Sequence, residues 1–81
     1  MIGNRLSEIS ATDEHAPLTV REIEVLSLVA SGATSKEIAE GLSLTVSGVD
    51  FHLRNVMGKL DARNRAHAVA KAVAQGFITV L

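Results

Sequence analysis

The sequence contains no cysteine, no tryptophan and no tyrosine, one proline and two phenylalanines. Without cysteine the chain can form neither a disulfide framework nor a thiolate metal site, which fits a reducing compartment. No apolar run approaches the roughly 18 residues that span a bilayer, and the first residues lack the apolar segment of a signal peptide. We therefore expect a cytoplasmic protein with neither a membrane segment nor a secretion signal.

The shortage of aromatic residues also limits the fold. Hydrophobic residues make up 47% of the chain but aromatic ones only 2%, so a core has to be built from alanine, valine, leucine and isoleucine. Such side chains suit close-packed short helices better than a β-sandwich. At 81 residues the chain can bury one modest core, so we expect a single all-α domain. We expect residues 1–16 to be a flexible arm or linker remnant and residues 17–81 to fold.

The net charge of −1 conceals an asymmetry along the chain. Residues 1–44 hold three basic and seven acidic side chains, a net charge of −4, whereas residues 45–81 hold five basic and two acidic ones, a net charge of +3. A whole-chain sum near zero therefore does not exclude a nucleic-acid partner, because the basic excess is gathered in the second half.

Capping residues predict where the helices begin. Thr19 with Glu22, and Thr34 with Glu37, form two capping boxes, and Thr45 offers a further N-cap. Together with the apolar periodicity, these signals predict a first helix that stops near residue 31, a short second helix that ends near Gly41, and a third helix over residues 45–60.

A last helix is predicted from about residue 65 to residue 75, with Asn64 as its N-cap and Gly76 at its end. Its expected core face consists of Ala66, Val69, Ala70 and Val73. A second face consists of Ala68, Lys71, Ala72 and Gln75. This second face either contacts a partner or is solvated, with its alanines serving helix propensity.

The predicted helix over residues 45–60 has two distinct faces. Its core stripe consists of Val49, Leu53, Val56 and Leu60, and its outer face of Ser47, Phe51, Arg54 and Gly58, with Asp50 and Asn55 at the flanks. A short helix, a tight link and a longer helix with a polar outer face are the outline of a helix-turn-helix. The outline alone also fits a generic helical scaffold.

Specific motifs narrow this choice. They are Leu18-Thr19-x-Arg21-Glu22-x-Glu24-Val25-Leu26, Gly32-x-Thr34-Ser35-Lys36-Glu37-Ile38-Ala39-x-x-Leu42, Val49-x-x-His52-x-x-Asn55-Val56-x-x-Lys59-Leu60, Arg65 and Gly76-Phe77-Ile78. In this order they resemble the LuxR-type (LuxR/FixJ/GerE) helix-turn-helix domain, and the match covers about residues 18–78. The resemblance implies a four-helix domain that binds double-stranded DNA as a homodimer on palindromic promoter sites. It also implies that the third helix reads the groove and that the fourth, through the second face defined above, forms the dimer contact.

By position, the resemblance assigns base contacts to Asp50, Phe51 and Arg54. Arg54 can donate two hydrogen bonds to guanine O6 and N7, with a phosphate contact as the alternative. Phe51 packs against a thymine methyl group or covers an apolar patch at the dimer or domain surface. Asp50 accepts from cytosine N4 or orients a neighbouring arginine, because a free carboxylate is repelled by phosphate.

Phosphate contacts need hydrogen-bond donors or positive charge. The expected backbone contacts are Lys36, Thr45, Ser47, Asn55 and Lys59, with pure capping as the alternative for Thr45 and solvated side chains as the alternative for the lysines. Gly48 departs from the family pattern, which usually has Thr or Ser there, and so removes a hydroxyl near the DNA backbone.

Other functional classes find little support. His15, His52 and His67 lack the spacing of a helical metal pair, and no phosphate loop or nucleophile motif occurs, so we expect no enzyme, no metal and no cofactor. The rival hypothesis is a protein-interaction module, or an antagonist that uses the same fold to dimerise with another regulator. RNA polymerase is a further candidate partner of a DNA-bound regulator.

Overall fold

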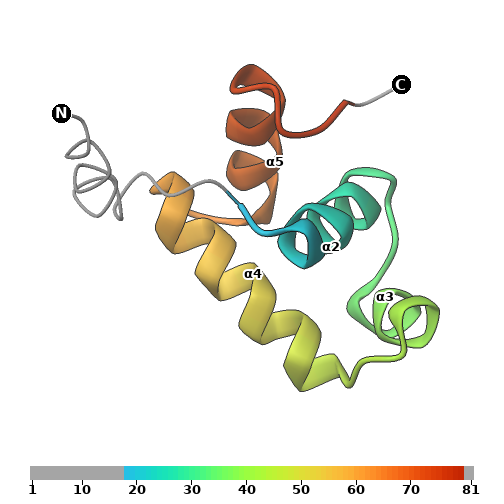
Figure 1. Cartoon of the computed structure of the whole chain (residues 1–81). Coiled ribbons are helices and arrows are strands. Elements are labelled where there is room, and N and C mark those ends of the chain that lie inside the picture. The colour runs from blue at the N-terminus through green and yellow to red at the C-terminus, as the bar shows by residue number, and fades with distance from the viewer. Residues whose placement is uncertain (1–17, 80–81) are drawn as a thin grey trace, which may run out of the picture.

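The computed structural model describes residues 18–79, which form four α-helices and no β-strand. The helices are α2 (Val20–Ala30), α3 (Ser35–Leu42), α4 (Val46–Leu60) and α5 (Arg65–Ala74). In Figure 1 the long α4 runs along one side, with α3 near its N-terminal end, α5 toward its C-terminal end and α2 between them. The all-α, four-helix expectation is confirmed, whereas the expected arm at residues 1–16 lies outside the described residues. None of the four helices is long and apolar enough to cross a membrane.

The first two helices begin as their capping boxes predicted. Thr19 Oγ1 accepts a hydrogen bond from the Glu22 N–H at 3.1 Å, and Glu22 Oε1 accepts one from the Thr19 N–H at 2.8 Å. The same reciprocal pair, at the same two distances, joins Thr34 and Glu37. Each box satisfies two of the backbone donors that a helix N-terminus leaves without an intrahelical partner.

The N-termini of α4 and α5 each use a single cap. Thr45 Oγ1 accepts from the Gly48 N–H at 2.9 Å, and Asn64 Oδ1 accepts from the His67 N–H at 2.8 Å. Both capping residues have extended backbone, so the chain changes direction where the sequence predicted that it would.

Left-handed residues end the helices. Gly32 (φ +97°) and Gly76 (φ +81°) follow α2 and α5, as predicted. The helix α3 ends at Leu42, one residue after Gly41, and its C-cap Ser43 has a φ of 59°. The helix α4 ends at Leu60, and its C-cap Asp61 has a φ of 56°. The prediction that the second helix ends near Gly41 is confirmed, although the residue with positive φ is Ser43. The next residue, Leu44, closes the turn, because its N–H donates to Ala39 O at 2.8 Å.

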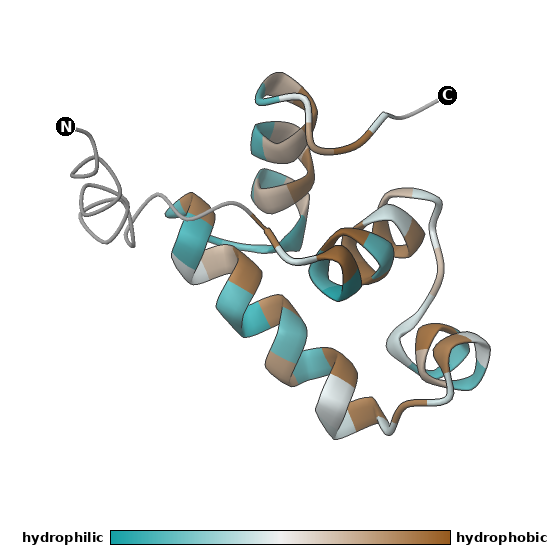
Figure 2. Cartoon of the chain, viewed as in Figure 1, coloured by the Kyte–Doolittle hydropathy of each residue, from teal (hydrophilic) through white to brown (hydrophobic). Residues whose placement is uncertain are grey.

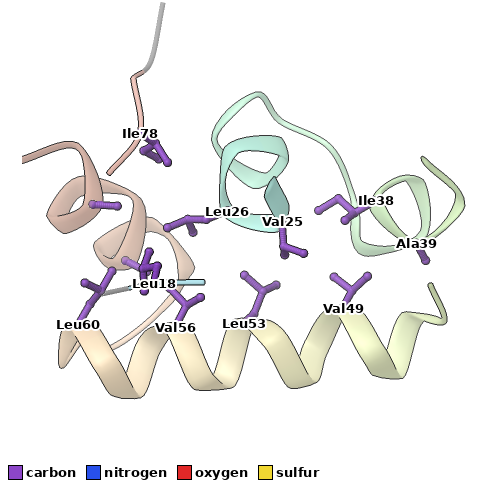
Figure 3. Packing of buried hydrophobic residues seen from close by; sticks show 12 residues of the cluster. Leu18, Val25, Leu26, Ile38, Ala39, Val49, Leu53, Val56, Leu60 and Ile78 are labelled. Carbon is purple, nitrogen blue, oxygen red and sulfur yellow. The ribbon is translucent and has the colours of Figure 1, made fainter. Parts of the chain in front are cut away.

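The predicted core stripe of α4 is confirmed, since all four of its residues are buried. In Figure 3 their side chains point from α4 toward the other helices. The residues packed around them come from α2, α3, α5, the segment before α2 and the segment after α5: Leu18, Val25, Leu26, Ile38, Ala39, Ala68, Ala72 and Ile78. Hydrophobic and hydrophilic positions alternate along α4 in Figure 2, as expected of a helix with one packed and one exposed face. Burial of each large aliphatic side chain contributes about 1.5–3 kcal/mol.

The predicted orientation of the last helix is wrong. Ala68 and Ala72 are fully buried, whereas Ala66 and Ala70, expected in the core, are exposed and Val73 is 41% exposed. Of the expected core face, only Val69 packs against the core. Alanine periodicity could not decide the orientation, because small apolar residues occupy both sides of this helix. The two buried alanines allow α5 to lie close to its neighbours α2 and α4, where larger side chains would hold it away.

Candidate nucleic-acid interface

The outer face of α4, which consists of Ser47, Phe51, Arg54 and Gly58, is exposed as predicted, and Asn55 at its flank is exposed as well. Phe51 is 53% exposed, and its ring contacts the ring of His52 edge-on, with 5.7 Å between the ring centroids. Within residues 18–79, Arg54 takes part in no ion pair and no side-chain hydrogen bond, so its guanidinium donors are available to a ligand. Together with Asn55, the face therefore combines one arginine, one large apolar ring and two uncharged polar groups.

The N-terminal end of α4 adds donors to this face. Ser47 is exposed in the first turn, close to the backbone N–H groups that favour an anion at a helix N-terminus. Thr45 is exposed as well; its hydroxyl oxygen accepts the N-cap hydrogen bond, and its O–H can still donate to a phosphate. At Gly48 an added Cβ would lie 3.2 Å from Thr45 Oγ1, which makes the space beside this cap narrow.

The carboxylate of Asp50 is half-buried and bonded to other side chains of the protein. Its Oδ1 accepts a hydrogen bond from Arg65 Nη2 at 3.1 Å and one from Ser35 Oγ at 3.4 Å, and Arg65 Nη2 also donates to Ser35 Oγ at 2.9 Å. The structure thus brings Asp50 together with two residues to which the sequence assigned no role in the site. Of the two alternatives considered for Asp50, the geometry corresponds to the orientation of a neighbouring arginine.

Lys59 is placed in an interior ion pair. Its Nζ lies 2.9 Å from Oε1 of Glu22, a residue that is only 4% exposed. Burial raises the pKa of Glu22, but the hydrogen bonds from Lys59 and Thr19 and the positive charge of Lys59 outweigh burial and leave that pKa below its ordinary value. The ammonium group predicted to touch the DNA backbone is thus committed to a buried carboxylate, and the lysine side chain is 27% exposed.

The remaining predicted backbone contacts are accessible. Lys36 is exposed in the first turn of α3 and forms no ion pair with any residue between 18 and 79. Asn55 is exposed one residue after Arg54. A phosphate beside α3 and one beside α4 could each find a donor at these two positions.

Two of the four predicted dimer residues of the last helix are wrong, because both alanines are buried in the core. Ala68 and Ala72 pack inside the chain, and Lys71 Nζ donates to the backbone oxygens of Leu60 at 2.8 Å and Asp61 at 3.2 Å. The ammonium group therefore caps the C-terminus of α4, where it complements the helix dipole. Of the four residues only Gln75 is exposed.

The surface that α5 offers instead consists of Ala66, Ala70 and Val73, hereafter the exposed face of α5. The spacing i, i+4, i+7 places these residues in one stripe of small apolar groups. The stripe lies on the side of the helix away from the two buried alanines, so a second chain could reach it without disturbing the core.

Metal ligands do not gather in the described part of the chain: no group of three His, Cys, Asp or Glu residues comes together between residues 18 and 79. The outer side of α4 presents hydrogen-bond donors, one phenylalanine and one arginine that forms no ion pair within residues 18–79. Such a set can bind a polyanion with base edges by charge, hydrogen bonding and apolar contact.

The chain is similar to known bacterial regulatory proteins. The family model described as bacterial regulatory proteins, luxR family, matches residues 16–72. The transcriptional repressor ThaA of Burkholderia thailandensis is 37% identical over 79 residues, which cover 98% of this chain and 33% of that protein. The transcriptional regulatory protein LiaR of Bacillus subtilis is 45% identical over 74 residues, which cover 86% of this chain and 35% of that protein.

A third relative is the HTH-type quorum sensing-dependent transcriptional regulator RpaR of Rhodopseudomonas palustris. It is 49% identical over 61 residues, which cover 75% of this chain and 25% of that protein. The chain therefore spans between a quarter and about a third of the length of these three curated relatives.

Proposed function

The chain belongs to the luxR family of bacterial regulatory proteins, and from this premise we propose that it binds a palindromic promoter site as a homodimer, with α4 in the major groove. Membership makes it a DNA-binding domain of transcription regulators and not an enzyme, as expected from its sequence. The observation that carries the proposal is the outer face of α4, which leaves Arg54 without a partner among the described residues and Phe51 exposed.

Base reading is assigned to Arg54 first. A guanidinium at the centre of a helix in the major groove can donate two parallel hydrogen bonds to guanine O6 and N7, worth about 1–3 kcal/mol of discrimination. Phe51, one turn nearer the N-terminus, offers an apolar surface to a thymine methyl group. Lys36, Ser47 and Asn55 are the proposed phosphate contacts, because each is exposed and carries a donor.

Dimerisation is assigned to the exposed face of α5. An apolar stripe of small residues permits two helices to approach closely, and a contact between two identical stripes is self-complementary, as two-fold symmetry requires. A two-fold dimer would present two copies of α4, which fits a palindromic site with half-sites about one helical turn apart.

The test is binding to an operator selected from random duplex DNA, followed by fluorescence anisotropy. Arg54→Ala is expected to weaken specific binding about 5- to 150-fold and to relax the preference at one base pair. The matched control is Arg21→Ala, which removes the same charge from the surface of α2, and it is expected to change affinity by less than about threefold.

Two results would contradict the proposal. If Arg54→Ala folds and binds the operator as wild type does, Arg54 does not read a base. If the wild-type chain binds no duplex even at low salt, the DNA-binding proposal fails for this chain, and the rival hypothesis of an interaction module that dimerises with another regulator takes its place.

A further inference from the structure

Three polar side chains from three different helices meet beside the outer face of α4. They are Ser35 at the start of α3, Asp50 in the second turn of α4 and Arg65 at the start of α5, here called the Ser35–Asp50–Arg65 cluster. Arg65 Nη2 lies 3.1 Å from Asp50 Oδ1 and 2.9 Å from Ser35 Oγ. The cluster thus links the carboxylate of α4 to a cation that neither belongs to α4 nor lies near Asp50 in the sequence.

Asp50 is out of place on a helix that approaches phosphate. It is the only acidic residue of α4, and its side chain is 43% exposed. A free carboxylate at this position would repel the DNA backbone. The charge of Arg65 at 3.1 Å compensates it within the protein.

Asp50 lies four residues before Arg54 on α4, so these two side chains could form an ion pair with each other. An acidic residue four positions before an arginine on a helix is well placed to form an ion pair with it. Asp50 does not form that pair: its carboxylate is bonded to Arg65 and Ser35, and Arg54 has no ion-pair partner within residues 18–79. Arg65 therefore binds the carboxylate of Asp50, which would otherwise pair with the guanidinium of Arg54, the proposed base reader.

We propose that Arg65 is a positioning residue for DNA recognition, which sequesters Asp50 and so keeps Arg54 available to guanine. This inference rests on the proposed function of α4. Ser35 takes part by holding the same guanidinium from the side of α3. Asp50 is then not a base reader, and its carboxylate is tolerable near DNA only while Arg65 is present.

A single substitution at Arg65, followed by a second substitution at Asp50, tests this role. Arg65→Ala is expected to weaken operator binding about tenfold, because the released carboxylate repels phosphate and pairs with Arg54. It is also expected to reduce the discrimination against an operator in which the guanine contacted by Arg54 is replaced. Adding Asp50→Asn to Arg65→Ala removes the charge, and the double variant is expected to recover most of the affinity and the discrimination.

Controls separate this role from a structural one. The Asp50–Arg65 pair is nearly half exposed, so circular dichroism should show the variants folded at the assay temperature. Arg21→Ala is a matched control, because Arg21 and Glu24 form an exposed pair with side-chain exposures of 42% and 47%, against 43% for both partners here. This control is expected to change the affinity less than threefold, as a loss of one surface charge does.

The outcomes are distinct. Recovery in the double variant supports the proposal. A double variant that binds no better than Arg65→Ala, with discrimination intact and the salt dependence reduced by about one phosphate contact, assigns Arg65 to direct phosphate binding and overturns it. An Arg65→Ala variant that binds as wild type does also overturns it. Absence of wild-type binding to any duplex refutes the proposed function itself, and this role for Arg65 with it.

Discussion

Replacement of Glu22 by glutamine is expected to lower the free energy of unfolding by about 1–2 kcal/mol at neutral pH. Glu22 is 4% exposed, and its carboxylate accepts from Lys59 Nζ at 2.9 Å and from the Thr19 N–H at 2.8 Å. Glutamine keeps an oxygen for the Thr19 N–H but loses the charge opposite Lys59. Removal of one partner from a fully buried ion pair costs about 3–5 kcal/mol, and the lower value follows because Lys59 is 27% exposed and can return to water.

The pH dependence has a definite sign. The pKa of Glu22 is lowered in the folded protein, so the folded state binds this proton less readily than the unfolded chain does. Its contribution to stability is therefore complete above the ordinary glutamate pKa of about 4.3, and is lost as the pH falls through the lowered native value. The Glu22→Gln variant lacks this titration, so the difference between it and the wild type should shrink in acid.

Thermal unfolding followed by circular dichroism between pH 7 and pH 2.5 measures both effects. At pH 7 the expected loss corresponds to a decrease in Tm of about 5–15 °C for a domain of this size. Glu24→Gln is the matched control, because Glu24 lies on the same helix in an exposed ion pair with Arg21 and should change stability by less than about 0.5 kcal/mol. A Glu22→Gln variant as stable as wild type at pH 7, or a difference that persists undiminished in acid, would refute the reasoning.

Two further predictions concern the outer surfaces. Val73→Lys, on the exposed face of α5, should leave the fold intact but lower the preference for a palindrome over a single half-site at least fivefold in anisotropy titrations. Ser27→Lys, on the exposed side of α2, adds the same charge and is the control. An equal loss of preference in that control would contradict the dimer assignment. Gly58→Ala should raise the unfolding free energy by about 0.5–1 kcal/mol, because an added Cβ meets nothing within 4 Å. Gly32→Ala should lower it by about 1 kcal/mol, because Gly32 has a φ of +97°. Chemical denaturation measures both, and an equal effect of the two substitutions would contradict the prediction.

Local interactions explain what the sequence predicted well. Thr19, Thr34 and Asn64 cap backbone groups only three residues away, so the signal for each helix start is contained in a few adjacent residues. The faces of α4 were predictable because large aliphatic side chains alternate there with polar ones at helical spacing. The exposure of Arg54 and Phe51 follows directly from that periodicity.

Tertiary contacts explain what the sequence did not predict. Alanines occupy both sides of α5, so its buried side was decided by the fit against α2 and α4 and not by hydropathy. Lys59 and Lys71 looked like surface lysines, but Glu22 and the end of α4 lie close enough to bind them. Arg65 is fifteen residues from Asp50 in the chain, and only the fold brings the two together.

Side chains of α5 bind α4 and its C-cap at two separate points. Arg65 binds Asp50 near the N-terminal end of α4, and Lys71 binds the backbone oxygens of Leu60 and Asp61 at its C-terminal end. A helix fixed near both ends by charge-assisted bonds resists rotation relative to its partner more than one fixed at a single point. In the proposed homodimer, the same α5 would also contact the second chain. The spacing of the two α4 helices, and with it the half-site spacing of the operator, would then be set by the α5 contact and conveyed to DNA through Arg65 and Lys71.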